Sequence, residues 1–211
     1  GTPPSPFLIQ GSETMIQTAH QAFPAPRDLS YDTPVLVTER LVLRPPHADD
    51  AADLTAIANN RQIAEMTSRM PFPYNLSDAH SFLEGCLAGE HEGYIYAITL
   101  ADTGRLIGFA GLELRERSGG FEIGFWLSET HWGMGYATEA ASALVDQAFR
   151  STDAERIHAV CRTVNPRSRN VIAKCGFAFI GLDEIDTIAA GRVPVERYSL
   201  DRAAWLARKE R

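Results

Sequence analysis

The chain contains 211 residues with a formal net charge of −7, and 45% of them are apolar, which is enough for one domain with a full core. The acidic balance argues against a nucleic-acid partner, because phosphate neutralisation requires clustered lysine and arginine. No apolar run approaches the length of a membrane span, so we expect no membrane association and a cytoplasmic location. Cys86, Cys161 and Cys175 lack metal-ligand spacing, which predicts reduced thiols and no metal site.

The N-terminal segment differs in composition from the remainder of the chain. Residues 1–34 hold six of the twelve prolines and show no sustained hydrophobic period. Such a composition is typical of a tail or a wrapping arm. We therefore divide the chain into a Pro-rich N-terminal arm over residues 1–34 and one domain over residues 35–211.

The first part of this domain reads as one strand followed by helices. Residues 35–43 alternate as a strand does and end at Arg44-Pro45-Pro46. Residues 47–59 and 61–67 are expected to be helical, and a third helix begins near Ser77, a suitable N-cap. An aromatic and proline-rich loop, residues 70–75, precedes that third helix.

The second part alternates strands with helices. Strands are expected at residues 94–100, 105–114, 121–127, 157–164, 177–188 and 192–200, with helices at 136–149, 166–175 and 201–208. This order predicts a mixed α/β (α+β) fold. Its sheet has about seven strands, is mostly antiparallel, is flanked by helices and contains one central βαβ crossover.

The segment from residue 121 to 149 combines a strand, a small-residue turn and a helix. Phe121, Ile123, Phe125 and Leu127 alternate with Glu122, Gly124, Trp126 and Ser128, so the strand has two different faces. The turn that follows, WGMGYA at residues 132–137, delivers bare backbone N–H groups to a helix N-terminus. Unpaired amides and the positive end of the helix dipole attract phosphate oxygens at such a place.

Three interpretations of this turn compete. The first is a dinucleotide fold, with Gly133-x-Gly135 after a strand and Asp153 about twenty residues further on, although Thr138 stands at the position of the third glycine. The second is a purely structural connection that uses glycine for tight packing. The third depends on segments elsewhere in the chain.

Three segments together resemble the GNAT N-acetyltransferases. Residues 133–140 (GMGYATEA), preceded by residues 122–128 (EIGFWLS), closely resemble their acetyl-CoA site, and the aromatic Trp132 is similar to the RimJ/RimL-like branch. Residues 38–45 (TERLVLRP) look like the first strand of that branch. Residues 165–177 (NPRSRNVIAKCGF) are similar to its second CoA-contacting segment. The likeness runs in matching order from about residue 35 to 200.

This resemblance implies the GNAT fold, in which splayed central strands hold acetyl-CoA as the cosubstrate. The strand would open at a bulge near Trp126 and Leu127, whose backbone groups would pair with pantetheine as an added strand does. The turn amides would grip the pyrophosphate. The cofactor-binding residues implied are Trp126, Leu127, Trp132, Gly133, Met134, Gly135, Tyr136, Ala137, Thr138, Asn165, Ser168 and Asn170. Arg167 and Arg169 either reach the nucleotide phosphates or lie on the surface.

The resemblance also implies two catalytic residues, Glu122 and Ser168. Glu122 is the candidate base, acting through water, and the alternative is a solvated carboxylate or a structural salt bridge. Many members place a tyrosine where this chain has Ile172, so Ser168 becomes the candidate that assists the departing thiolate. Asn165-Pro166 also reads as an N-cap and first helical residue, and this capping role is compatible with ligand binding.

The acceptor is the least determined part. Phe72, Tyr74 and Trp126 are candidate substrate-binding residues in an apolar and aromatic pocket, and His131 either lines the acceptor side or is exposed. The implied acceptor is a primary amine, first a protein or peptide N-terminal α-amine. A small amine such as an antibiotic, a polyamine or an amino-acid conjugate is the alternative. A non-catalytic acyl-CoA binding protein is an alternative of another class, and a homodimer is compatible with the resemblance.

Overall fold

The structure is a computed structural model that describes residues 33–210. The Pro-rich arm predicted over residues 1–34 therefore lies almost entirely outside the described residues. The strands are β1 (Leu36–Val37), β2 (Leu41–Arg44), β3 (Gly93–Leu100), β4 (Leu106–Arg115), β5 (Gly120–Leu127), β6 (Arg156–Arg162), β7 (Ala178–Thr187) and β8 (Gly191–Asp201). The helices are α1 (Ala51–Ala58), α2 (Arg61–Met66), α3 (Leu76–Leu87), α4 (Tyr136–Ser151), α5 (Pro166–Lys174) and α6 (Arg202–Lys209).

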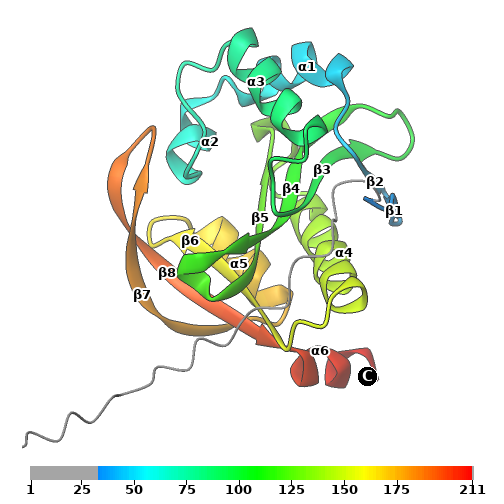
Figure 1. Ribbon diagram of the computed structural model, residues 1–211, viewed down its shortest axis with the longest axis vertical. Coiled ribbons are helices and arrows are strands. Elements are labelled where there is room, and N and C mark those ends of the chain that lie inside the picture. Colours follow the sequence, from blue (N-terminus) through cyan, green and yellow to red (C-terminus); the bar gives the residue numbers. More distant parts are fainter. Residues whose placement is uncertain (1–32, 211) are drawn as a thin grey trace, which may run out of the picture.

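The strands form one sheet in the order β1-β2-β3-β4-β5-β6-β8-β7 (Figure 1). Every neighbouring pair is antiparallel except β5 and β6. These two strands run parallel and are joined by a crossover connection that contains α4. The predicted mixed and mostly antiparallel architecture is confirmed. The dinucleotide interpretation is wrong, because a doubly wound fold requires a mostly parallel sheet.

The sheet has one strand more than the seven segments expected from the sequence, because the first segment forms two short strands. The backbone N–H of Thr38 donates to the carbonyl oxygen of Leu41 at 2.9 Å, and the Thr38 hydroxyl oxygen accepts from the backbone N–H of Leu41 at 3.1 Å. This tight turn folds β1 back onto β2, so that Leu36 pairs with Leu43 and Val37 with Val42. The sheet described here accordingly has eight strands.

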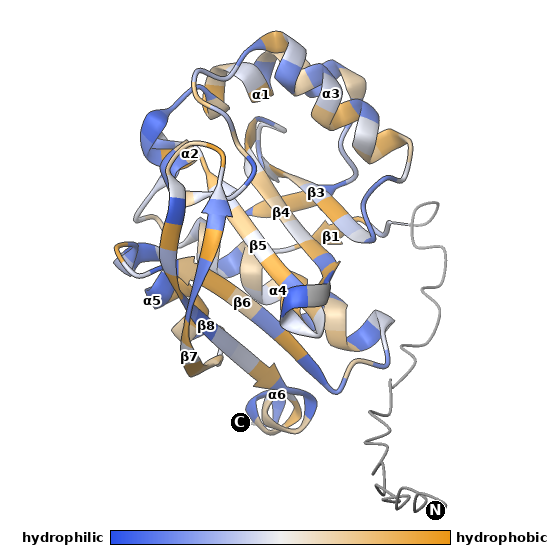
Figure 2. Ribbon diagram, turned by 60° about the vertical axis from the view of Figure 1, so that its left-hand side comes forward, coloured by the Kyte–Doolittle hydropathy of each residue, from blue (hydrophilic) through white to orange (hydrophobic). Residues whose placement is uncertain are grey.

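Helices cover the two faces of the sheet with two separate cores. Helices α4, α5 and α6 contribute Leu144, Phe149, Ile172 and Trp205, among others, to the larger core. Helices α1 to α3 pack a smaller core against Phe109 and Ala97 on the opposite face. Figure 2 shows apolar residues concentrated along the central strands. Between residues 33 and 210, every helix is too short or too polar to cross a bilayer.

The contact between β5 and β6 is short. Only two Cα pairs join them, Glu122 with His158 and Ile123 with Ala159, whereas β4 and β5 stay paired from Gly120 to Leu127. Beyond Ile123 the two parallel strands separate, while β6 continues along β8. The sheet therefore opens between the last halves of β5 and β6, next to the N-terminal ends of α4 and α5.

Candidate active site

A cavity of about 1110 Å³ lies where β5 and β6 separate. Its walls come from β4, β5, β6, the loop between α2 and α3, and the first turns of α4 and α5. The lining contains these sequence-predicted site residues: Tyr74, Glu122, Trp126, Leu127, Trp132, Gly133, Gly135, Ala137, Thr138, Asn165, Ser168 and Asn170. The structure thus brings together residues from four separate segments of the chain. Phe72, Met134 and Tyr136 do not line the cavity.

The glycine turn owes its shape to two left-handed residues. Gly133 and Gly135 have φ angles of +77° and +86°, a region that side-chain-bearing residues rarely adopt. Gly135 caps α4, and the first amide that bonds back into the helix belongs to Glu139, at 3.0 Å from the Gly135 carbonyl oxygen. The amides of Tyr136, Ala137 and Thr138 therefore lack an intrahelical partner and face outward at the positive end of α4. This end can hold phosphate oxygens.

A carboxylate from α4 fixes this turn to the start of the sheet. Glu139 accepts hydrogen bonds from the Thr38 hydroxyl at 2.6 Å, and from the backbone N–H and the Nε–H of Arg40, both at 2.8 Å. Arg40 also donates to the carbonyl oxygen of Met134 at 3.0 Å and lies over the Tyr136 ring. Met134 and Tyr136 thus face the Arg40 side of the turn. We refer to Thr38, Arg40 and Glu139 as the turn clamp.

The strand edge that faces the opening belongs to Phe125 and Leu127. The N–H of Ser128 donates to Ile107, which makes Leu127 and Gly108 a pair that is not hydrogen-bonded, and the bonding alternates along the strand. The backbone of Trp126 therefore points to β4, and that of Phe125 and Leu127 points to the opening. The expectation that Trp126 offers its backbone is wrong, and so is the expected bulge, because the β4–β5 register has no shift.

One backbone group of this strand edge already has a hydrogen-bond partner within the protein. The indole Nε1–H of Trp132 donates to the carbonyl oxygen of Leu127 at 2.8 Å, which ties the turn to the strand end. The N–H of Leu127 and both backbone groups of Phe125 remain directed at the opening. An extended ligand can pair with these groups as an additional strand would. The side chain of Trp126 lies on the face of β5 opposite to the side chains of Phe125 and Leu127, and Trp126 lines the cavity.

The first turn of α5 forms the other wall of the opening. The Asn165 side chain accepts from the backbone N–H of Ser168 at 3.1 Å, which confirms the N-cap reading. The Ser168 side chain lines the cavity, as does Arg167, whose guanidinium lies 4.7 Å from the centre of the Trp132 ring. Arg169 is instead bound to both carboxylate oxygens of Glu196, at 2.7 and 2.8 Å. Of the two arginines, Arg167 is the one placed beside the turn.

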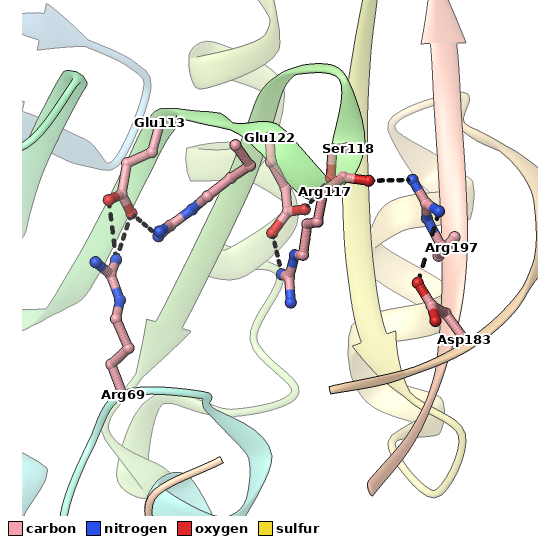
Figure 3. Close-up of polar contacts among 8 residues, drawn as sticks. Arg69, Glu113, Arg117, Ser118, Glu122, Asp183 and Arg197 are labelled. Carbon is pink, nitrogen blue, oxygen red and sulfur yellow. Dashed lines mark hydrogen bonds and ion pairs between the residues drawn. The ribbon is translucent and has the colours of Figure 1, made fainter. Parts of the chain in front are cut away.

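Glu122 lies in the cavity wall with both carboxylate oxygens engaged (Figure 3). Arg117 donates to one oxygen at 2.7 Å, and the buried Ser118 hydroxyl donates to the other at 2.5 Å. Each oxygen retains a lone pair that can accept from a water molecule. Since strand residues rise about 3.3 Å each, Glu122 sits about 10 Å along β5 from Phe125 and about 16 Å from Leu127. It can reach a group bound at either residue only through water.

His131 is the other basic group next to the turn. Its Nδ1 lies 2.6 Å from the Ser128 hydroxyl oxygen, and the residue lines the cavity. Burial, and then the positive charge of Arg105, lower the pKa of His131 below its ordinary value. The imidazole is therefore neutral at neutral pH and able to accept a proton.

The cavity wall on the α1–α3 side is part aromatic and part charged. Phe109 and Trp126, paired across β4 and β5, stack with ring centres 5.7 Å apart, and the buried Tyr74 lies in the same lining. Phe72, predicted to bind the acceptor, lies outside the lining, where the Arg61 guanidinium covers its ring. The sequence places Phe72 and Tyr74 in the same loop but does not indicate which of the two aromatic rings points into the cavity.

A charged cluster around Glu113 is the main feature that the sequence did not reveal. Glu113 is the cross-strand partner of Glu122 and accepts from Arg69 at 2.6 and 2.9 Å and from Arg115 at 2.8 Å (Figure 3). The Nδ1 of His91 lies 3.5 Å from the same carboxylate. The two-residue alternation of β4 puts Glu113 on the Glu122 face, but Arg69, which lies 44 residues away along the chain, carries no local signal.

The Glu113 cluster predicts a pH-dependent contribution to stability. Burial raises the pKa of Glu113, but hydrogen bonds from His91 and Arg69 and nearby arginine charges outweigh it and lower the pKa to about 2 from 4.5. The ionised carboxylate therefore stabilises the fold above pH 4.5 by roughly 3 kcal/mol, and this is lost as the pH falls towards 2.

Glu113→Gln removes that carboxylate. We expect a lower free energy of unfolding in urea at about pH 7 and a smaller difference from the unsubstituted protein at about pH 3, where the carboxylate begins to protonate. Glu184→Gln is the control, because it removes an exposed carboxylate that pairs with the exposed Arg192. A destabilisation by Glu113→Gln that stays constant between the two pH values would contradict the assignment.

Comparisons with known proteins agree with this geometry. A family model described as an acetyltransferase (GNAT) domain matches residues 40–178. An uncharacterized N-acetyltransferase of Bacillus licheniformis, p20, is 30% identical over 169 residues, which cover 78% of this chain and 94% of that protein. The ribosomal-protein-serine acetyltransferase of Escherichia coli K12 is 28% identical over 129 residues, covering 59% of this chain and 71% of that enzyme.

A solved structure shows the same fold with a ligand. Mycobacterium smegmatis RimJ in complex with CoA-disulfide superimposes with a TM-score of 0.66 at 22% identity, covering 77% of this chain and 82% of that one. The matched family model spans more than half of the 211 residues. The chain therefore belongs to the GNAT family of acetyl-CoA-dependent acetyltransferases, and its relatives include RimJ/RimL-like enzymes.

Proposed function

We propose that this protein transfers the acetyl group of acetyl-CoA directly to a primary amine, and that the amine is an N-terminal α-amine of a protein or peptide. The observation that carries the proposal is the alignment of two binding elements. The open backbone edge of Phe125 and Leu127 leads towards the outward-facing amides of Tyr136 to Thr138. Pantetheine is extended and polar along its length, and pyrophosphate follows it, so the two elements match the two parts of CoA in order.

The reaction takes place in the opening between β5 and β6. The N–H of Phe125, the residue of the open edge further from the turn, is a donor for the thioester carbonyl oxygen, which gains negative charge as the amine attacks. A C–N bond forms, the C–S bond breaks, the nitrogen loses one proton and the sulfur leaves as a thiolate. The chain must therefore position the amine, accept one proton and stabilise the sulfur.

The proton transfer favours an α-amine over a lysine side chain. An α-amine with a pKa of about 7.7–8.0 costs less than about 1 kcal/mol to deprotonate near pH 7.4, whereas lysine at about 10.4 costs roughly 4. The carboxylate of Glu122 is already held by Arg117 and Ser118, so it serves at most as a weak base through water. Neutral His131 is the second acceptor for the proton. Such modest bases suffice for an α-amine.

The relatives favour the same class of acceptor. The Escherichia coli relative is a ribosomal-protein-serine acetyltransferase, which acts on a protein. The aromatic wall of Tyr74, Phe109 and Trp126 offers apolar area for a first side chain next to the amine. A small primary amine is the second candidate, because the charged groups beside this wall suit a compact polar ligand.

The direct test is acetyl transfer by the purified full chain. We expect CoA release from acetyl-CoA, measured with a thiol-reactive dye, to rise at least about 100-fold above the enzyme-free rate with a suitable amine among N-terminal peptides and small amines. Mass spectrometry locates the acetyl group on the α-nitrogen. Tight CoA binding without transfer to any amine of the panel would support a non-catalytic acyl-CoA binder and contradict the proposal.

Ser168→Ala tests the thiolate side. We expect kcat to fall by about tenfold or more with little change in the KM for acetyl-CoA, because the hydroxyl acts as the sulfur leaves. The N-cap should survive, since Asn165 accepts from the Ser168 backbone N–H and not from its hydroxyl. Ser77→Ala on the exposed start of α3 is the matched control. An unchanged kcat in Ser168→Ala would remove Ser168 from the mechanism.

A further inference from the structure

Arg162 occupies a particular place at the end of β6. The parallel register pairs Ile123 with Ala159, so three residues further along each strand Arg162 stands level with Trp126 across the opening. Side-chain alternation from the Glu122–His158 pair puts Arg162 and Trp126 on the same face of the sheet. That face is the one covered by α1 to α3, and both residues line the cavity. Arg162 therefore borders the half of the cavity opposite α4 and α5.

The contacts of Arg162 leave its charge without a counter-ion. Its Nη1 donates to the backbone carbonyl oxygen of Glu65 in α2 at 2.6 Å, and its Nε is buried without a hydrogen-bond partner. Among residues 33–115 and 117–210, no carboxylate forms an ion pair with it. The carboxylate of Glu65 itself lies 3.7 Å from Arg61.

The other arginines on this side of the cavity differ from Arg162 in this respect. Arg69 and Arg115 share Glu113, and Arg117 is bound to Glu122, with distances of 2.6 to 2.8 Å (Figure 3). A half-buried cation without an anion is costly, and an orphaned buried donor needs an explanation such as a ligand. Among these four arginines, Arg162 is therefore the one whose guanidinium has no carboxylate partner and can bind an anionic ligand.

The surface between Trp126 and Glu122 has room for that ligand. Gly124 lies between them on β5, and a Cβ built there would meet no atom within 4 Å. The cross-strand partner of Gly124 is Gly111, which also lacks a side chain, but a Cβ there would meet Cδ1 of Ile95 at 3.0 Å. The open part of this glycine floor therefore lies over Gly124. Phe109 and Trp126 border this glycine floor on one side, and Glu113 and Glu122 border it on the other. Both glycines belong to the cavity lining.

We propose that Arg162 binds an anionic group of the acceptor, a carboxylate or a phosphate, while the rest of the acceptor lies over the glycine floor. Guanidinium groups bind these anions through several N–H groups at once, and the bond to Glu65 holds Arg162 in place for it. The inference rests on the proposed amine acetylation and narrows its acceptor to amines that carry a nearby negative charge. Polyamines and other polycations would be rejected by the uncompensated guanidinium.

Pairs of amines that differ in one anionic group test this assignment. Phenylalanine is compared with phenethylamine, O-phosphoethanolamine with ethanolamine, and a Ser-Asp peptide amide with its Ser-Asn counterpart. We expect kcat/KM to favour the anionic member of at least one pair by about tenfold or more. The pair that shows the preference tells whether the anion comes from a small molecule or from a peptide side chain.

Arg162→Met should reduce that preference to less than about threefold, while the KM for acetyl-CoA and the rate on the uncharged member stay within about twofold. Arg192→Met is the control, because Arg192 is exposed on β8 and pairs with Glu184 away from the cavity. Equal rates on both members in the unsubstituted enzyme, or a preference that survives Arg162→Met, would overturn the proposal.

A binding measurement separates this proposal from the proposed reaction. Calorimetry of the CoA-bound full chain with phenylacetate, which has no amine, should give a dissociation constant about tenfold lower than in Arg162→Met. Equal affinities in the two proteins would contradict the role of Arg162 whether or not any amine is acetylated. Absence of acetylation with phenylacetate binding intact would contradict only the proposed reaction.

Discussion

The early separation of β5 from β6 is the constraint on which the site depends. Two Cα pairs hold the strands together, and beyond Ile123 and Ala159 the backbone of Phe125 and Leu127 has no strand beside it. Unpaired backbone groups inside a sheet require partners, and an extended ligand in the cavity can supply them as an added strand would. The same opening brings the N-terminal ends of α4 and α5 to one place. Fold and binding site thus have a common cause.

The turn clamp shows how distant segments cooperate. Glu139, nearly one hundred residues beyond Arg40, accepts from both Thr38 and Arg40, and Arg40 reaches on to Met134. A turn of two left-handed glycines would otherwise have many conformations, and this bonding selects one before a ligand arrives. The segment TERLVLRP therefore contributes to the site although none of its residues lines the cavity. Its importance follows from the support it gives to the phosphate-binding turn.

Sequence patterns predicted much of the fold and the cofactor side, because both depend on local signals. Alternation, capping residues and glycines located β5, α4 and the N-cap at Asn165. Predictions failed where the answer depends on tertiary contacts. Hydrogen-bond alternation assigns the open edge to Phe125 and not to Trp126, Arg61 covers Phe72 outside the cavity, and Thr38 breaks the first strand. The charges around Glu113 and the lone charge of Arg162 appear only after the sheet is assembled.

Hydrogen–deuterium exchange of backbone amides with and without CoA tests the central claim most directly. If CoA lies along the β5 edge and ends at the α4 turn, exchange should slow at Phe125 and Leu127 and across residues 133–138, with smaller changes in the sheet between β2 and β4. Binding of CoA that leaves these amides unchanged and protects another part of the chain would contradict the account.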